Sequence, residues 1–353
     1  MQSYNFDFSK KIFYQPEKIV RFKEGKRPFP HTLELDLTNR CNHRCVFCNF
    51  KTHLKKSRAV LESNLITKRM AEAYDLGTRG ICITGGGEPT LHREFVPLIQ
   101  RFRAIGFDLG LITNGSLMAG KEPYLIENLQ WIRISMGGGD RQSYRAAEGV
   151  DHFEKLIQNI YALSERKRFA HSRLNIGIRI LVTQANLESL GNIAAILRDG
   201  AINYLQLAPD QFSEPAKARF WHSQKTRAVF AEVEKILEPA GVKLLRSGFS
   251  ITPQNLDFPR MCYAHFFHIA ITAEGDLMFC KNARGNMRKG DEFVFGNIHA
   301  NSLQEIWNGS RVKEMEARIR PNNCGYFCKN FALNAALEET LFPDEDMSPN
   351  FVS

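Results

Sequence analysis

Apolar and polar residues alternate along the first two thirds of the chain as short strands and longer helices. Strands are expected at residues 33–37, 80–84, 108–113, 131–136, 174–182 and 204–208. Helical spacing fills the intervals, at residues 65–76, 94–105, 120–129, 153–168 and 187–198. Such alternation is typical of a parallel sheet covered by helices. Six units are too few to close an eight-stranded barrel, so the sequence predicts an α/β fold with a partial (β/α)6, TIM-like barrel.

The pattern changes after Pro209. A helix is expected at 215–238, followed by a hairpin with Gly275 in its turn, between Ile269–Thr272 and Leu277–Cys280. These elements predict a small α+β region after the barrel. The predicted organisation is an N-terminal segment (1–30), the barrel (31–240), the small region (241–342) and a flexible tail (343–353).

The eight cysteines are the most informative feature of the composition. No run of 18 apolar residues predicts a membrane span, and residues 1–7 lack the basic and apolar regions of a signal peptide. We therefore expect a cytoplasmic chain, in which disulfides are rare. The cysteines need another explanation, and metal binding is the obvious one.

Three cysteines lie within eight residues directly after the first predicted strand, as Cys41-x3-Cys45-x2-Cys48. Three thiolates on one short loop can hold three corners of an iron–sulfur cluster. They can equally hold zinc, with His43 or His53 as a fourth ligand. Thiol chemistry alone leaves both alternatives open.

The spacing of this loop, with the aromatic Phe47 before its last cysteine, resembles the signature of the radical S-adenosylmethionine (SAM) superfamily. Further motifs follow on successive strand ends: Gly85-Gly86-Gly87-Glu88-Pro89 resembles the GGEP motif, and Thr113-Asn114-Gly115, Ser135 and Asn186 match other recurrent positions. Relatives often have an acid closely after the serine; here that acid is either displaced to Asp140 or absent, and we assign Asp140 no role. The resemblance spans about residues 31–210.

The resemblance implies that Cys41, Cys45 and Cys48 hold a [4Fe-4S] cluster whose open iron is chelated by SAM. Reductive cleavage of SAM would then give a 5′-deoxyadenosyl radical. Alternation along two strands adds Arg179 and Gln206, which are expected to face the barrel interior, with Ile176, Ile178 and Ile180 toward the helices. The candidate cofactor-binding residues are Phe47, Gly86, Gly87, Glu88, Thr113, Asn114, Ser135, Arg179 and Gln206.

Four further cysteines lie in the C-terminal region: Cys262, Cys280, Cys324 and Cys328. Their arrangement resembles the auxiliary-cluster extension called SPASM, or its shorter twitch form, and implies a second [4Fe-4S] cluster. The final Cys324-x3-Cys328 spacing departs from the more usual C-x2-C, so which of these two ligates the cluster is open. A zinc site is the alternative.

Cys82 is the remaining cysteine, and it lies within the second predicted strand. A buried free cysteine is common in protein cores, and this is our expectation for it. The functional alternative is a catalytic hydrogen-atom donor to a substrate radical, as in epimerases of the superfamily.

The formal net charge of +9 adds little, because the basic residues are scattered. It suits an acidic flavodoxin- or ferredoxin-type electron donor, whereas a nucleic-acid partner is not indicated without a basic stripe. Only 40 residues precede Cys41, fewer than the peptide-recognition domain of many peptide-modifying relatives. We therefore expect a radical SAM oxidoreductase or isomerase that oxidises or epimerises a small sugar, aminocyclitol or nucleoside-type metabolite. The alternatives are oxidative modification of a peptide or protein side chain and, from another class, a zinc- or cluster-containing nucleic-acid-binding protein.

Overall fold

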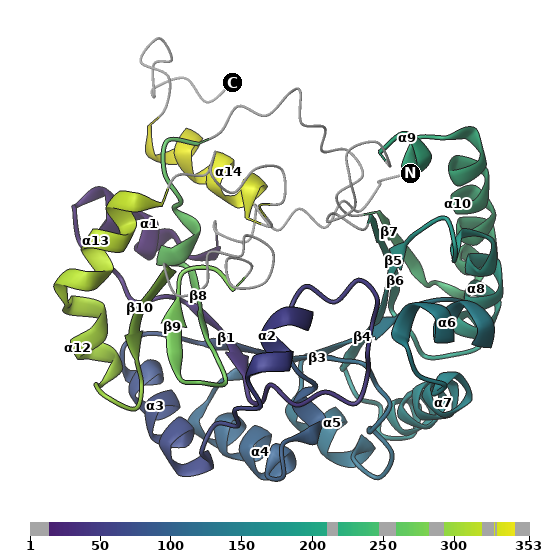
Figure 1. The fold of residues 1–353 in the computed structure, drawn as a ribbon, viewed down its shortest axis with the longest axis horizontal. Helices are drawn as coiled ribbons and strands as arrows, with labels where there is room; N and C mark the ends of the chain where they lie inside the picture. The colour runs from purple at the N-terminus through teal and green to yellow at the C-terminus, as the bar shows by residue number, and fades with distance from the viewer. Residues whose placement is uncertain are drawn as a thin grey trace.

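A curved ten-stranded sheet organises the whole chain (Figure 1). The computed structural model describes residues 14–209, 218–246, 259–281, 293–319, 328 and 330–342. The strand order across the sheet is β10-β9-β8-β1-β2-β3-β4-β5-β6-β7. The predicted tail, residues 343–353, lies outside the described residues.

The six predicted barrel strands are present and run parallel to their neighbours. They are β1 (Thr32–Asp36), β2 (Gly80–Thr84), β3 (Asp108–Thr113), β4 (Trp131–Met136), β5 (Asn175–Val182) and β6 (Tyr204–Pro209). A short seventh strand, β7 (Lys243–Arg246), pairs in parallel with β6. The sheet thus continues past residue 240, where the predicted barrel ends. The sequence of β7, Lys-Leu-Leu-Arg, does not alternate between apolar and polar residues, so the pattern gave no signal for a strand.

Helices cover the outer face of this curved sheet, as Figure 1 shows. Those that were predicted are α3 (Ser63–Asp75), α4 (Phe95–Ile105), α5 (Glu122–Asn128), α7 (Phe153–Phe169), α8 (Leu190–Arg198), and α9 with α10 (Ala218–Trp221 and Gln224–Leu237). The sequence analysis missed α1 (Pro16–Lys23), α2 (Lys51–Lys56) and α6 (Arg141–Glu148). Asp140, to which no role was assigned, caps α6: its carboxylate accepts from the Ser143 N–H at 2.8 Å.

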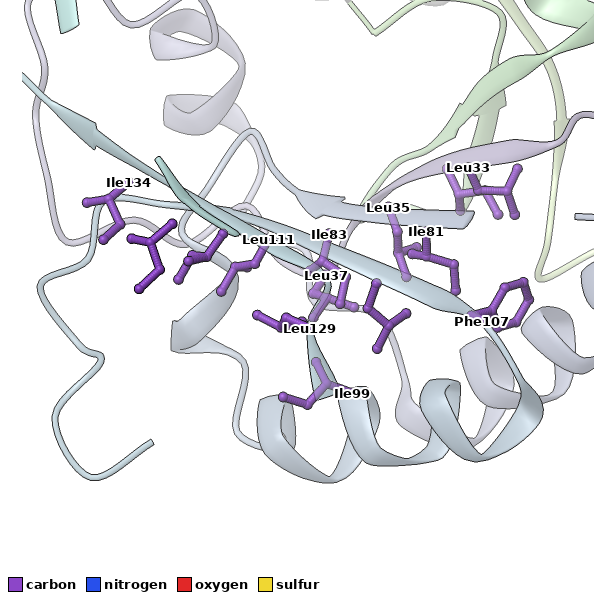
Figure 2. Packing of buried hydrophobic residues seen from close by; sticks show 14 of the residues in the cluster. Leu33, Leu35, Leu37, Ile81, Ile83, Ile99, Phe107, Leu111, Leu129 and Ile134 are labelled. Atoms are coloured by element: carbon purple, nitrogen blue, oxygen red, sulfur yellow. The ribbon is translucent and has the colours of Figure 1, made fainter. Parts of the chain in front are cut away.

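The hydrophobic core lies between the sheet and these helices. Alternate residues of each strand point into it, such as Leu33 and Leu35 on β1 and Ile81 and Ile83 on β2 (Figure 2). Ile99 of α4 packs against them from the helix side. The residues between these core positions face the barrel interior, where the sheet carries its chemistry.

The C-terminal region extends the same sheet. β8 (His268–Ile271) pairs in parallel with β1, and β9 (Asp276–Met278) and β10 (Val294–Asn297) continue it as antiparallel strands. The predicted hairpin is confirmed, with Gly275 at φ +83° in its turn. Helices α12 (Leu303–Asn308), α13 (Ser310–Arg318) and α14 (Phe331–Leu341) complete this part. Within the described ranges, no helix combines the length and the apolar character needed to cross a bilayer.

Candidate active site

The loop that carries Cys41, Cys45 and Cys48 follows β1 and is held by the C-terminal end of α6. The Arg44 N–H donates to the Glu148 carbonyl at 3.0 Å, and the Val46 N–H donates to the Ala147 carbonyl at 2.9 Å. Gly149 ends α6 with φ +67°, and a Cβ there would lie 2.7 Å from the Arg44 carbonyl oxygen. Helix α6 therefore provides a rigid support on which the three-cysteine loop rests.

All three thiols of this loop are partly buried. Burial raises the pKa of Cys41 to about 11 and also raises that of Cys48. Burial and the nearby Glu148 carboxylate raise the pKa of Cys45. Protonated thiols are thus favoured until a cation compensates the thiolate charge, which is the situation at a metal-binding loop.

Glu148 is a buried side chain that the sequence analysis missed. Its Oε2 accepts from the Cys45 thiol at 2.7 Å and lies 3.2 Å from His43 Nδ1. His43 Nε2 in turn lies 3.3 Å from His152 Nδ1. His43, Cys45 and Glu148 are the one group of three or more possible ligands within 4.8 Å of one another in the described part of the chain. His53, the other candidate zinc ligand, is engaged elsewhere, 2.8 Å from Glu274.

The glycine run after β2 packs directly against the residues that precede Cys41. The Gly87 N–H donates to the Thr38 carbonyl at 3.2 Å, and the Glu88 N–H donates to the Arg40 carbonyl at 2.8 Å. A Cβ at Gly87 would lie 2.3 Å from the Arg40 oxygen, closer than any side chain tolerates. Gly86 donates to Asp36 Oδ2 at 3.2 Å. Glycine is therefore required where the two strand-end loops meet.

Glu88 is buried and joins the glycine run to the end of β3. Its carboxylate accepts from Thr113 Oγ1 and Thr90 Oγ1, both at 2.6 Å, from the Thr90 N–H at 3.1 Å and from the Asn114 N–H at 2.8 Å. Three of these bonds reach Oε1 and one reaches Oε2, so Oε2 can accept from a further donor. In this structure Glu88 positions the strand ends, and its expected contact with the SAM ammonium would use this remaining capacity of Oε2.

A polar triangle links the end of β3 to the cysteine loop. Asn114 Nδ2 donates to Asn42 Oδ1 at 2.9 Å, Asn42 Nδ2 donates to Ser116 Oγ at 2.8 Å, and Ser116 Oγ donates back to Asn114 Oδ1 at 2.7 Å. Asn42 directly follows Cys41. Thr113 and Asn114, both predicted site residues, thus fix the loop from its other side.

A second group of predicted residues lines a cavity of about 140 Å³. Phe47 from the cysteine loop, Ser135 from β4 and Arg179 from β5 contribute to it. Gln206 is buried on β6 beside Arg179, its register partner. The predicted orientation of β5 is confirmed, because Ile176, Ile178 and Ile180 are buried toward the helices. Asn186 is used differently: its Nδ2 donates to the carbonyls of Gly137 and Leu181.

Cys82 does not pack in the hydrophobic core. Ile81 and Ile83 are buried against the helices, and Cys82, between them, is partly exposed on the opposite face of β2. Its register partners are Glu34 and Gly110. The core expectation is wrong, and period-two parity along β2 would have placed this thiol in the barrel interior.

The C-terminal cysteines follow the expected elements. Cys280 comes just after β9, Cys262 accepts from Asn334 Nδ2 at 3.7 Å, and Cys328 precedes α14. Cys324, the fourth predicted ligand, lies outside the described residues.

Lys281, next to Cys280, connects this region to the barrel, and sequence reasoning missed it. Its Nζ lies 3.0 Å from Asp36 Oδ1 at the end of β1 and 3.4 Å from Thr84 Oγ1 at the end of β2. Burial raises the pKa of Asp36, and the nearby ammonium opposes that shift. The hairpin tip makes a second connection: Glu274 Oε1 accepts from Asn39 at 2.6 Å.

These residues fit the groups implied by the sequence. Three thiols on one supported loop suit an iron–sulfur cluster. The polar cavity beside that loop suits the polar end of SAM, because Phe47 of the loop and Ser135 of β4 line it.

Comparison with known sequences decides between the alternatives. The profile of the radical SAM superfamily matches residues 35–177, and that of SPASM, an iron–sulfur cluster-binding domain, matches residues 262–330. The chain belongs to the radical SAM superfamily. It is a radical SAM enzyme with a C-terminal SPASM domain, so the zinc-protein and nucleic-acid readings are set aside.

Curated relatives cover this radical SAM enzyme to different extents. The tungsten-containing aldehyde ferredoxin oxidoreductase cofactor-modifying protein of Pyrococcus furiosus is 23% identical over 301 residues, 79% of this chain and 81% of the relative. The probable GTP 3′,8-cyclase of Methanothermobacter thermautotrophicus is 32% identical over 131 residues, 36% of this chain and 42% of the relative. The second likeness thus spans less than half of either chain.

Solved structures share the fold of the radical SAM enzyme. Streptococcus suis SuiB bound to the precursor peptide SuiA superposes with a TM-score of 0.64 at 15% identity, covering 85% of this chain and 70% of SuiB. The protein anSMEcpe with bound AdoMet gives a TM-score of 0.61 at 17% identity, covering 86% and 87%. The predicted α/β partial barrel followed by a mixed region is therefore confirmed.

Proposed function

We propose that this radical SAM enzyme oxidises or epimerises a small polar metabolite of the sugar, aminocyclitol or nucleoside type. Cys41, Cys45 and Cys48 would hold the [4Fe-4S] cluster that binds SAM. Cys262, Cys280, Cys324 and Cys328 would hold one auxiliary [4Fe-4S] cluster. When bound, these groups supply a hydrogen-abstracting 5′-deoxyadenosyl radical and an electron acceptor.

The protein's own part in this reaction is to orient the reactants and exclude water. Helix α6 fixes the cysteine loop, and the Glu88 network fixes the strand ends beside it. Phe47, Ser135 and Arg179 lie together around the cavity next to that loop. A group held there would lie between the loop and the barrel interior, where a substrate hydrogen can be reached.

The observation that carries the choice of substrate is the polar interior of the barrel. Arg133, Ser135, Arg179 and Gln206 all occupy inward positions on the strands. Peptide-recognition sites are commonly sheet edges or surface grooves, whereas these side chains lie on strands inside the fold. A small polar molecule suits them better. The sequence relatives add support, since their names specify a cofactor-modifying protein and a GTP cyclase.

Two outcomes are possible after hydrogen abstraction, and the structure offers a residue for each. For an oxidation, an auxiliary cluster held by Cys262, Cys280, Cys324 and Cys328 would supply the electron acceptor, and the alcohol carbon would become a carbonyl after loss of the second electron and a proton. Lys281 supports this arrangement, because it directly follows Cys280 and its Nζ contacts Asp36 at the mouth of the barrel. In an epimerisation, the substrate radical instead receives a hydrogen atom, and Cys82 would supply it from an inward-facing thiol. The resulting thiyl radical would be reduced by one electron from the flavodoxin- or ferredoxin-type donor and would take up one proton.

An acidic flavodoxin- or ferredoxin-type donor would deliver the electron at the outer side of the cysteine loop. Arg44 is exposed there, and Val46 is 65% exposed. The exposed Arg145 lies on α6, whose end contacts this loop. An apolar contact among positive charges suits an acidic protein partner.

Anaerobic reconstitution tests the proposal. We expect 5′-deoxyadenosine from dithionite and SAM, about eight irons per chain on the general cluster expectation, and loss of SAM cleavage when Cys41, Cys45 and Cys48 are changed to Ala. Candidate sugars, nucleosides and peptides are then compared for stimulated cleavage, using deuterated substrates to follow transfer into 5′-deoxyadenosine. Stimulation by peptides alone would contradict the small-metabolite proposal. Cys82→Ala separates the outcomes: an epimerase loses product formation, and an oxidase with no thiol step retains it.

A further inference from the structure

Two arginines of the barrel interior form a feature that the proposed chemistry does not explain. Arg133 lies on β4 and Arg179 on β5, both at inward positions. In the register of the sheet, Arg133 pairs with Gly177, and Arg179 pairs with Ser135 at the cavity. Arg133 is therefore two residues, about 7 Å along the strand, deeper than Ser135.

The Nε atom of each arginine is buried without a hydrogen-bond partner, and neither arginine forms an ion pair with a described residue. Other partly buried arginines of this chain are paired. Arg27 contacts Glu316, and Arg69 lies 3.1 Å from Glu72. A buried guanidinium without a carboxylate is costly, so an unpaired pair of them indicates a missing anion.

The neighbouring side chains make room for such a group and add no negative charge. The Tyr204 ring lies over Gly177, where a Cβ would be only 2.0 Å from its Cζ. The glycine thus makes room for the phenol at the level of Arg133, which is the register partner of Gly177 on the neighbouring strand. Burial and the positive charge of Arg133 lower the pKa of Arg179 to about 9. An anion between the guanidiniums would relieve that repulsion.

We propose that Arg133 and Arg179 bind an oxyanion group of the substrate, a phosphate or a carboxylate, inside the barrel. This inference rests on the proposed function, since it describes the substrate of the same site. Guanidinium groups suit oxyanions because their planar forks donate two parallel hydrogen bonds. With the charged group anchored at the depth of Arg133, the rest of the molecule extends toward the cysteine loop.

The competing explanation is that the arginines serve the carboxylate of SAM. Calorimetry under anaerobic conditions on the reconstituted holoenzyme separates the two, with pyrophosphate, phosphate and succinate as probes at constant ionic strength in chloride. We expect at least one probe to bind in the presence of saturating SAM. Stronger binding of pyrophosphate and phosphate indicates a phosphorylated substrate, and stronger binding of succinate indicates a carboxylate.

Variants assign the binding to the two residues. R133Q and R179Q are expected to weaken binding of the preferred probe at least tenfold. R133K is expected to weaken this binding less, because lysine keeps the positive charge but lacks the forked guanidinium group. R198Q, which changes an exposed arginine of α8, is the matched control and should bind as the wild type does. In the wild-type enzyme, the reduced paramagnetic clusters should also broaden the ³¹P signal of bound pyrophosphate, should phosphate be the preferred group.

Three results would overturn the inference: no probe binds the wild type above chloride, SAM abolishes the binding, or R133Q and R179Q bind as tightly as R198Q. A wild-type enzyme that binds the probe but yields no 5′-deoxyadenosine would instead contradict the proposed function. The two failures are therefore distinguishable.

Discussion

Gly87→Ala tests whether close contact between the glycine run and the cysteine loop holds the site together. The new Cβ would lie 2.3 Å from the Arg40 oxygen and 2.6 Å from the Thr38 oxygen, both backbone atoms that cannot rotate away. The two loops must separate, which breaks the hydrogen bonds from Gly87 to Thr38 and from Glu88 to Arg40. Losing both bonds costs about 1–3 kcal/mol, and overpacking adds about 1–3 kcal/mol. We expect a loss of about 4 kcal/mol in the free energy of unfolding, in the middle of the combined range.

Urea unfolding of the anaerobically reconstituted protein, followed by circular dichroism, measures this loss. Iron content and 5′-deoxyadenosine formation report on the site, and both should fall in the variant. Gly191→Ala is the matched control, because nothing lies within 4 Å of a Cβ there and the residue is in α8. It should be neutral or slightly stabilising. If Gly87→Ala has the same urea midpoint as Gly191→Ala and cleaves SAM normally, close contact at Gly87 does not hold the site together.

Three further changes test single contacts. Glu88→Gln places an amide N–H against the Asn114 N–H or the threonine donors, and urea unfolding should show a loss of about 2–4 kcal/mol; an unchanged midpoint would contradict the network. Lys281→Met leaves Asp36 buried without its cation, so the folded state keeps the Asp36 carboxyl protonated to higher pH than the unfolded chain does. The free energy of unfolding of Lys281→Met should therefore fall further below that of wild type as pH rises, as measured at pH 5.5 and 8; a difference between the two proteins that does not depend on pH would contradict this. Arg145→Glu should slow reduction by an acidic flavodoxin at low salt, in stopped-flow experiments, more than Arg198→Glu does; equal rates would place the donor elsewhere.

The barrel was predictable because its strands bury one face against helices, and alternation along the sequence records that burial. The six expected strands agree with β1 to β6 within one residue at each end. The motif residues were also predictable, because the glycines, cysteines and polar residues at strand ends can be recognised from their spacing in the sequence. Helix α6 was missed because it is short and mostly polar, although Asp140, Ser143 and Gly149 are recognisable capping residues.

The supporting residues could not be predicted, because their roles depend on contacts between distant segments. Glu148 is 103 residues from Cys45, and Lys281 is 245 residues from Asp36. Nothing near either residue in the sequence indicates its partner. Cys82 is a different case. Because side chains alternate along a strand, the apolar Ile81 and Ile83 already indicate that Cys82 lies on the opposite face, in the barrel interior.

The pairing of β8 with β1 has a consequence for how the protein is made. Strand β1 is synthesised early, but its neighbour on one edge begins only at residue 268. Until then the emerging chain presents an unpaired edge next to the cysteine loop, and such edges invite pairing with other chains. Glu274, just beyond β8, must also arrive before its contact with Asn39 can form. Maturation of the first metal site is thus tied to completion of the last quarter of the chain, and a protein truncated before residue 268 should aggregate rather than accept iron.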